Sequence, residues 1–155
     1  MTGAIRLLCL ACVLVLGTTS EVVAGDRTHA ARQYYSGWSR NTQRSYYYRS
    51  YYYQPSPSYF GYRHHYTIYY PSRPEYLYFY NPYKKVFWGR CPAHGDGKGQ
   101  YSLLAQRDRK GSLKQIPESA FPEMGAMPPI PESTDEAVME MPPDDLPSEG
   151  TPPGM

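Results

Sequence analysis

The sequence predicts a chain that is mostly disordered, with one small all-β hairpin or meander at about residues 75–116 behind a helical signal peptide. Leu, Ile, Val and Phe fill only 14 of the 131 positions from residue 25 onward. Such a chain buries too little apolar surface to offset the backbone entropy of folding, about 1–2 kcal/mol per residue. Residues 75–116 are the exception, because strand-forming residues and turn residues alternate there.

Charge is also strongly segregated along the chain. Residues 25–114 carry 15 Lys and Arg against four Asp and Glu, whereas residues 115–155 carry nine Asp and Glu and neither Lys nor Arg. A high local charge of one sign favours solvated, extended chain. The two halves are expected to attract each other loosely, through ion pairs that salt screens.

Residues 1–24 are predicted to be a cleavable signal peptide. Arg6 precedes an apolar run from Leu7 to Gly17, and Val22-Val23-Ala24 offers small residues for cleavage after Ala24. Eleven apolar residues fall short of the roughly 20 that a membrane-spanning helix needs. We therefore expect export to the periplasm, cell surface or medium, with no membrane span in the mature chain.

The mature chain keeps one cysteine, Cys91, so no internal disulfide is expected. Cys91, His94 and Asp96, with His64 and His65 upstream, offer too few ligands at recognisable spacing for a structural metal site. A Cys–His nucleophile would lack a third orienting group, and no hydrolase, nucleotide-binding or zinc-protease motif occurs. The sequence thus predicts no metal, no cofactor and no enzymatic activity.

Residues 25–74 form a basic, low-complexity segment that holds thirteen of the eighteen tyrosines. The run RSYYY occurs twice in tandem, as Arg44–Tyr48 and Arg49–Tyr53. Neither run shows the alternation of apolar and polar residues that marks a strand or helix, and four prolines interrupt the segment. No regular element is predicted here.

This segment predicts the leading function, adhesion or self-association. An Arg guanidinium over an exposed tyrosine ring gains about 0.5–1 kcal/mol, a weak contact that many copies multiply. The partner would be a second copy or a cell-envelope polymer, and nucleic acid is not expected in an exported chain. A linker with no selected partner is nearly as good an interpretation. The residues expected to self-associate are Arg44, Tyr46, Tyr47, Tyr48, Arg49, Tyr51, Tyr52 and Tyr53.

Residues 75–116 predict a hairpin, with strands at 76–80 and 85–88 joined by an Asn-Pro turn at 81–84. Alternation places Tyr76, Tyr78 and Tyr80 on one face and Leu77 and Phe79 on the other. Two more short strands are expected at 101–105 and 112–116. This module carries the alternative function, in which Tyr76, Tyr78, Tyr80 and Trp88 form a platform for a glycan or peptide.

Residues 117–155 read as an acidic, disordered tail with ten prolines in 39 positions. Local polyproline II structure is expected at 128–131 and 141–143.

Three blocks carry a family resemblance: YFYNPYKKVFWGRCP (Tyr78–Pro92), QYSLLAQRDRKGSLKQIPESAFP (Gln100–Pro122), and the tail motifs MPPIPEST and MPPDDLP. In these blocks, about half of the mature chain, the sequence resembles small exported proteins of planctomycete-type bacteria. The resemblance implies an exported protein and no established activity. The sequence as a whole therefore predicts an exported, non-enzymatic envelope or extracellular protein.

Overall fold

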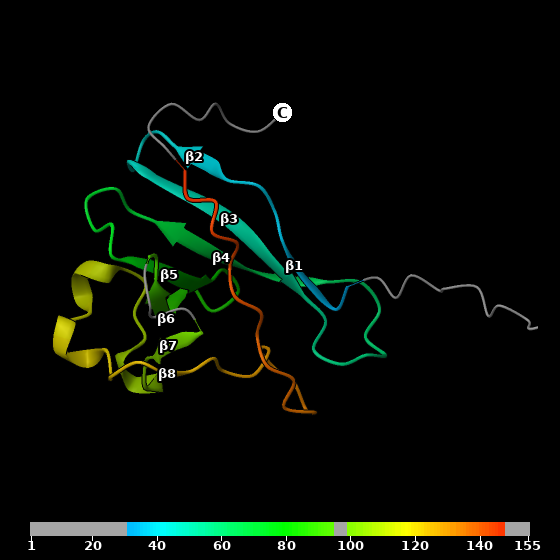
Figure 1. Cartoon of the computed structure of the whole chain (residues 1–155). Coiled ribbons are helices and arrows are strands. Elements are labelled where there is room, and N and C mark those ends of the chain that lie inside the picture. The colour runs from blue at the N-terminus through cyan, green and yellow to red at the C-terminus, as the bar shows by residue number, and fades with distance from the viewer. Residues whose placement is uncertain (1–30, 95–98, 148–155) are drawn as a thin grey trace, which may run out of the picture.

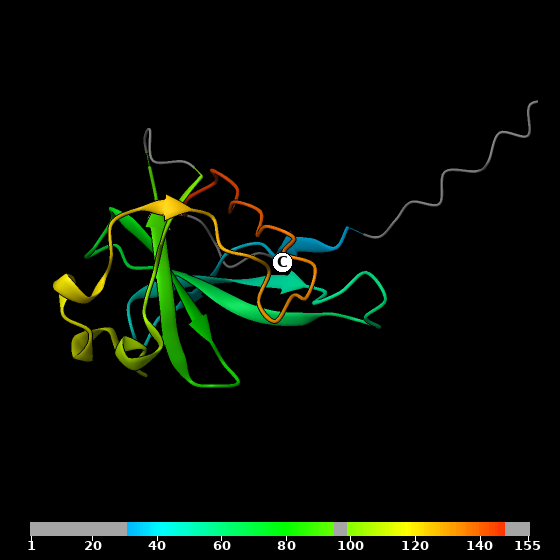
Figure 2. The same cartoon turned by 90° about the horizontal axis from the view of Figure 1, so that it is seen from below.

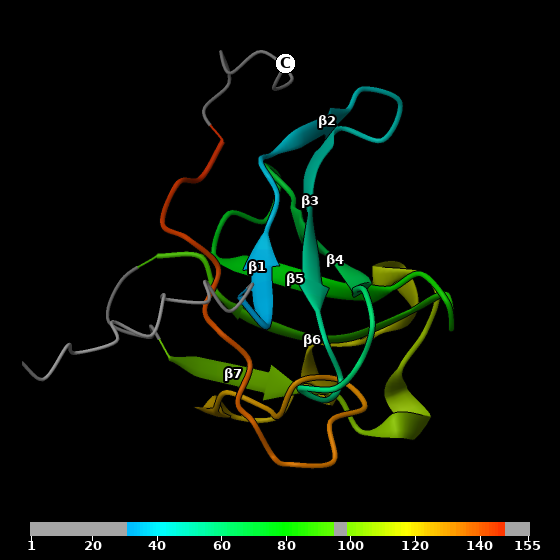
Figure 3. The same ribbon diagram turned by 90° about the vertical axis from the view of Figure 1, so that its right-hand side faces the viewer.

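Eight strands form one antiparallel sheet in the computed structural model of the chain, which describes residues 31–94 and 99–147. The strand order is β1-β3-β4-β5-β6-β7-β8, and β2 also pairs with β3. The sheet curls strongly, so that β1 and β3 cross the direction of β6 and β7 (Figures 1 and 3). The strands are β1 (Gln33–Tyr35), β2 (Ser39–Asn41), β3 (Tyr46–Tyr53), β4 (Arg63–Tyr69), β5 (Tyr76–Asn81), β6 (Val86–Pro92), β7 (Gln100–Leu103) and β8 (Gly125–Ala126).

The predicted hairpin is confirmed as β5 and β6. The side chain of Asn81 shapes its turn by accepting hydrogen bonds from the backbone N–H groups of Tyr83 and Lys84, each at 2.9 Å. The register slips between Phe79, which pairs with Gly89, and Tyr80, which pairs with Phe87. This bulge leaves Trp88 as the extra residue of β6.

Of the two further strands expected after the hairpin, one forms and the other does not. The first is confirmed as β7, which pairs with β6. The second is wrong, because residues 112–116 contain the 3-10 helix η3 (Leu113–Gln115) instead of a strand. With η2 (Gln106–Asp108) and η4 (Glu118–Ala120) it belongs to an irregular cover, residues 104–121, over part of one sheet face.

Residues 31–74 correct the expectation of an unstructured segment, because they contribute β1 to β4. The pairing of β3 with β4 runs without interruption from Tyr47↔Tyr69 to Tyr53↔Arg63. Burial along β3 alternates strictly, with the odd-numbered residues buried and the even-numbered ones half-buried. Tyrosine serves both faces because its ring packs and its hydroxyl tolerates water, so the strand carries no apolar–polar pattern in its letters.

The prolines of this segment mark its turns. Pro55 and Pro57 lie in the loop between β3 and β4, and Pro71 and Pro74 lie between β4 and β5. A proline in a loop removes no ladder hydrogen bond. The prolines therefore argue for strand boundaries here, not against strands.

Each face of the sheet has its own cluster of buried residues. One face, called the tail face below, buries Tyr51, Tyr53, Leu77, Phe79, Trp88, Cys91 and Tyr101 beneath Ile130 and Met139 of the C-terminal segment. The other, called the tyrosine face, buries Ile68, Tyr78 and Phe87 beneath Leu104 and Ile116 of the cover. Figures 1 and 2 show the cover (yellow) and the C-terminal segment (orange to red) on different sides of the sheet.

Residues 122–147 of the C-terminal segment are ordered, which corrects the expectation of a disordered tail for this part of the chain. Ile130 and Met139 are 1 % and 2 % exposed, and an isolated bridge pairs Pro129 with Val138. Prolines suit an extended segment that lies across a sheet without pairing along its length, because a proline has no backbone N–H in need of a partner. The segment is anchored by side chains of the sheet rather than by a long ladder.

The predicted signal peptide, residues 1–24, lies outside the described residues, as do residues 95–98 and 148–155. Within the part of the chain that is described, no helix has the length and apolar character needed to cross a membrane.

Candidate functional site

A cleft of about 790 Å³ lies on the tyrosine face, where the cover stops short of β3 and β4. Five half-buried tyrosines line it: Tyr46 and Tyr48 from β3, Tyr66 and Tyr70 from β4 and the residue after it, and Tyr80 from β5. Its floor and far wall include Ile68, Phe87 and Leu113. We call this site the tyrosine cleft.

Strand alternation explains why these tyrosines share one side. Even-numbered residues of β3, β4 and β5 all point to the tyrosine face. Edge-to-face ring contacts then fix the neighbours, with ring centroids 5.4 Å apart for Tyr46 and Tyr70 and 5.6 Å apart for Tyr48 and Tyr66. The rings are held by packing, so the cleft is formed before any ligand arrives.

Most of the tyrosine hydroxyls in the cleft remain available. The Tyr46 hydroxyl accepts a hydrogen bond from Asn41 at 3.3 Å. Within residues 31–94 and 99–147, the hydroxyls of Tyr48, Tyr66, Tyr70 and Tyr80 have no protein partner. Burial raises the pKa of Tyr66 and raises that of Tyr70 to about 12, which keeps both hydroxyls protonated and able to donate at neutral pH.

Positive charge surrounds the cleft. The exposed side chains of Arg44, Arg73 and Lys114 belong to its lining, and the lining contains no Asp or Glu. No carboxylate in the described part of the chain forms an ion pair with these three cations. The cleft therefore presents aromatic rings, free hydroxyls and uncompensated positive charge together.

The predicted hairpin platform does not form, and the structure corrects that prediction. Tyr78 is 2 % exposed and lies under Phe121 of the cover, with ring centroids 6.3 Å apart. Trp88 points to the tail face, where it packs against Tyr101 and is 7 % exposed. The bulge in β6 and the cover, neither visible in the residue pattern, separate the members of the platform. Of the four predicted residues, only Tyr80 reaches the cleft.

Tyr76, the remaining member of the predicted platform, packs against the cover. Its ring and that of Phe121 enclose the guanidinium of Arg90, at 3.9 Å and 4.0 Å from the ring centroids. Arg90 also forms an ion pair with Glu118. Tyr76 thereby helps to attach the cover to the sheet.

The residues predicted to self-associate are divided between the two faces of the sheet and do not form one continuous surface. Tyr47, Arg49, Tyr51 and Tyr53 are at most 5 % exposed and belong to the interior. Arg44, Tyr46 and Tyr48 line the tyrosine cleft. Tyr52 remains half-buried on the tyrosine face beyond the cleft.

Four residues of the cleft were not predicted from the sequence: Tyr66, Tyr70, Arg73 and Lys114. A signal was present for the first two, because Tyr66-Thr67-Ile68-Tyr69-Tyr70 places an aromatic or aliphatic residue at every second position. Recognising β4 would have placed Tyr66 and Tyr70 on one face. The contribution of Lys114 depends on the path of the cover and has no local signature.

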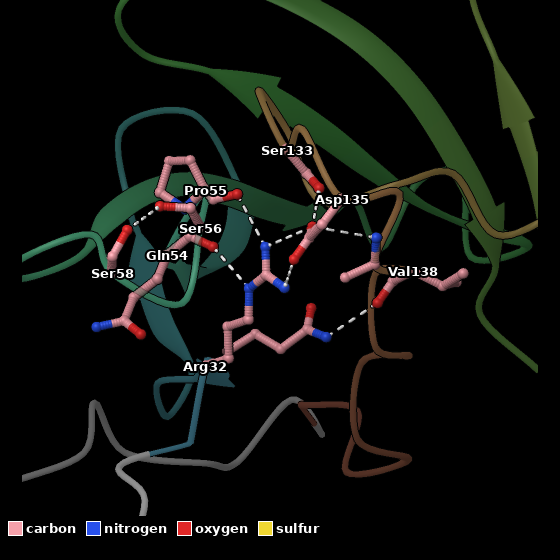
Figure 4. A network of polar contacts seen from close by, with 10 residues as sticks. Arg32, Gln54, Pro55, Ser56, Ser58, Ser133, Asp135 and Val138 are labelled. Atoms are coloured by element: carbon pink, nitrogen blue, oxygen red, sulfur yellow. Dashed lines mark hydrogen bonds and ion pairs between the residues drawn. The ribbon is translucent and has the colours of Figure 1, made fainter.

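The C-terminal segment is clamped to the tail face by arginines. Arg32 binds both carboxylate oxygens of Asp135, at 2.6 Å and 2.9 Å, and also donates to the backbone carbonyls of Gln54 and Pro55 (Figure 4). Beside it, the side chain of Gln33 donates to the Val138 carbonyl at 3.0 Å. The hydrogen bond from Arg32 holds the pKa of Asp135 well below its usual range.

A second clamp joins Arg49 to Asp145, again through two hydrogen bonds, of 2.8 Å and 2.9 Å. The Arg49 guanidinium also lies over the Trp38 ring, 4.5 Å from its centroid, and the Trp38 indole donates to the Asp145 carbonyl. The hydrogen bond from Arg49 lowers the pKa of Asp145. Asp135 and Asp145 of the C-terminal segment are thus paired with arginines on the face opposite the tyrosine cleft.

Cys91 is fully buried, and burial raises the pKa of its thiol to about 12. His94 is exposed, and Asp96 lies outside the described residues. In residues 31–94 and 99–147, no three His, Cys, Asp or Glu side chains gather as a metal site would require. The chain matches no protein-family model, no curated protein and no solved structure.

Proposed function

We propose that this is an exported, non-enzymatic protein of the cell envelope or extracellular space that adheres to carbohydrate through the tyrosine cleft. The observation that carries the proposal is one site that combines packed aromatic walls with tyrosine hydroxyls and cations that have no hydrogen-bond or ion-pair partner among the described residues. Export rests on the apolar run of residues 7–17 and the small residues before position 25.

Carbohydrate suits this lining better than a purely apolar ligand does. A sugar ring has weakly polar C–H faces and a rim of hydroxyl groups. Tyrosine has the matching combination of a flat ring and a hydroxyl that both donates and accepts. Tyr48, Tyr66 and Tyr80 each bring a ring and a free hydroxyl to the cleft.

The same lining favours binding over catalysis. Glycoside hydrolysis commonly uses two carboxyl groups about 5–10 Å apart, and other hydrolytic reactions need a general base. The cleft contains no Asp, Glu, His or Cys. The proposed role is therefore recognition and retention of a polymer.

Self-association is a second candidate, favoured by one surface feature. The loop between β3 and β4 presents Phe60, which is 100 % exposed, next to Tyr59, which is 38 % exposed. An apolar side chain left in water at a loop tip suits contact with another surface. Sedimentation of the wild-type protein and of Phe60→Ser over a range of concentrations would test it, and an unchanged monomer in both would reject it.

The proposed function is tested by affinity electrophoresis of residues 25–155 through gels that contain different cell-wall and capsular polysaccharides. Wild type is expected to be retarded by at least one polysaccharide. Tyr48→Phe, which removes only a hydroxyl, and Lys114→Ala, which removes an exposed cation, are expected to reduce the retardation. Lys84→Ala is the matched control, because Lys84 is exposed but lies outside the cleft lining.

Two results would reject carbohydrate binding at this site. One is the absence of retardation by every polysaccharide tested. The other is a retardation that the two cleft variants leave as strong as the Lys84→Ala control does. Circular dichroism of each variant would establish that the sheet is retained.

A further inference from the structure

The aromatic surface does not end at the tyrosine cleft. Tyr66, in the cleft, contacts His64 with ring centroids 5.3 Å apart, and His64 contacts Tyr52 at 5.8 Å. Tyr52 in turn stacks on Tyr34 of β1, at 4.8 Å and an interplanar angle of 18°. We call Tyr34, Tyr52 and His64 the aromatic track. It extends the cleft along β3 and β4 towards the opposite end of the sheet.

Each residue of the track is at least partly exposed. Tyr34 is 41 % exposed, and Tyr52 and His64 are half-buried. The cover packs elsewhere, with Phe121 against Tyr78 of β5. The C-terminal segment lies on the opposite face. The rings of the track therefore remain in reach of a ligand that already occupies the cleft.

The length of this surface distinguishes kinds of ligand. Tyr46 in the cleft and Tyr52 in the track are six residues apart on one strand, which corresponds to about 20 Å at roughly 3.4 Å per residue. Tyr34 extends the surface further, onto β1. A single sugar unit spans only part of this distance, whereas a linear chain of several units would contact the cleft and the track at once.

The charged side chains of the cleft indicate that the ligand is negatively charged. In the described part of the chain, the tail carboxylates of Glu132, Asp135 and Asp145 form ion pairs with arginines. No ion pair between residues of 31–94 and 99–147 involves the cations of the cleft, Arg44, Arg73 and Lys114. A ligand that carries carboxylate, sulfate or phosphate groups would supply the missing negative charge.

We propose that the ligand is a linear, negatively charged polysaccharide that lies along β3 and β4, from the tyrosine cleft across His64 and Tyr52 to Tyr34. This inference rests on the proposed function and adds a second subsite, the length of the ligand and its charge. Single-stranded nucleic acid offers similar stacking and charge. The export signal favours a polysaccharide, and nucleic acid enters the test as a competing outcome.

The test is calorimetric titration of residues 25–155 with oligogalacturonates from disaccharide to octasaccharide, with neutral cello-oligosaccharides of the same lengths, and with oligothymidylate. Affinity is expected to rise with the length of the acidic oligomers and to fall as salt is added, because salt screens exposed charges over about 10 Å at 0.1 M. The neutral oligomers are expected to bind more weakly.

Two track variants locate the second subsite. Tyr52→Ala and Tyr34→Ala are expected to weaken binding of the octasaccharide about tenfold, roughly the loss of one stacking contact, and to leave disaccharide binding unchanged. Tyr59→Ala is the matched control, because Tyr59 is 38 % exposed and forms no ring contact in the described structure. Tyr34 is at the surface, so its truncation keeps the test independent of any folding defect in Tyr52→Ala.

The outcomes separate this inference from the proposed function. If disaccharides bind in the cleft but longer chains bind no better, or the track variants bind the octasaccharide like Tyr59→Ala, the track is wrong and the cleft stands. If neutral and acidic oligomers bind equally, the assigned charge is wrong. Tighter binding of oligothymidylate than of the octasaccharide would reject a polysaccharide in favour of nucleic acid. If no saccharide of either kind binds, this inference fails, and a parallel lack of retardation in the polysaccharide gels would reject the proposed function as well.

Discussion

Gly89, in the middle of β6, lies where a ring crosses the sheet backbone. It pairs with Phe79 on one side and with Leu103 on the other. A methyl group added at Gly89 would overlap the hydroxyl and two ring carbons of Tyr101. Gly89→Ala is therefore expected to destabilise the whole sheet.

The size of the effect follows from how little Tyr101 can move. It is 2 % exposed, and its ring packs against Phe79 at 5.2 Å and Trp88 at 5.5 Å between centroids. Overpacking of a full core costs about 1–3 kcal/mol. Because the overlap involves three atoms of a side chain that is packed on both sides, we expect the upper part of that range, about 3 kcal/mol, or a Tm lower by about 10 °C for a chain of this size.

Urea unfolding followed by circular dichroism and tryptophan fluorescence measures the loss. Gly37→Ala is the matched control, because Gly37 is exposed and a methyl group there would meet nothing within 4 Å. This control is expected to change stability by less than about 0.5 kcal/mol.

A double-mutant cycle identifies the cause. In a Tyr101→Ala background the overlap is gone, so Gly89→Ala should cost little there, giving a coupling of about 2–3 kcal/mol between the two sites. The reasoning is refuted if Gly89→Ala is no more destabilising than Gly37→Ala. It is equally refuted if the glycine substitution costs the same with and without the Tyr101 ring.

Three further predictions concern ionisable groups of the tail face and of the C-terminal segment that crosses it. Asp145→Asn leaves the buried Arg49 without its charge partner and is expected to cost about 2 kcal/mol in urea unfolding, less than a fully buried pair because Asp145 is 62 % exposed; Glu123→Gln, at an exposed site, is the control. Burial lowers the pKa of His65 to about 3. Between about pH 6.5 and pH 3 the unfolded chain therefore binds a proton at this imidazole, whereas the folded chain does not. Stability should fall between pH 6.5 and 3 by at most about 1.4 kcal/mol per pH unit from this group, and His65→Phe should reduce that slope; an unchanged slope contradicts the assignment. Cys91 should resist thiol reagents at pH 8 in the native state and react once the chain is unfolded in urea; rapid native labelling would contradict its burial.

The elements predicted correctly from the sequence are those whose structure is determined by residues close together in the chain. The hairpin of β5 and β6 depends on the Asn81 turn and on the alternation from Tyr76 to Tyr80, all within a dozen residues. By contrast, β3 was missed because the run YYYRSYYY places the same residue on both faces. Tyrosine recurs on both faces of this strand, and a search for apolar–polar alternation does not detect such a pattern.

The order of the C-terminal segment depends on contacts between distant parts of the chain. Arg32 and Asp135 are separated by 103 positions, and Arg49 and Asp145 by 96. Composition predicts disorder for residues 117–155 because it counts only the apolar residues within that segment. The binding surface for Ile130 and Met139 is supplied by tyrosines that the same method had assigned to a disordered region. The tyrosine cleft could not be predicted for a similar reason, since its lining combines residues of β2 to β6 with residues 111–114 of the cover.

The segregation of charge along the sequence is partly compensated by ion pairs between the acidic C-terminal segment and arginines of the tail face. The acidic segment crosses the tail face and pairs there with Arg32, Arg49 and Arg63. Those arginines are thereby used in folding, whereas no ion pair between described residues involves Arg44, Arg73 or Lys114 at the tyrosine cleft, so these cations would be available to the proposed ligand. Had the tail carboxylates been free to reach the cleft, they would compete with an anionic ligand for the same cations. Clamping them on the opposite face leaves a cleft whose lining carries cations and no Asp or Glu, in a chain of small net charge.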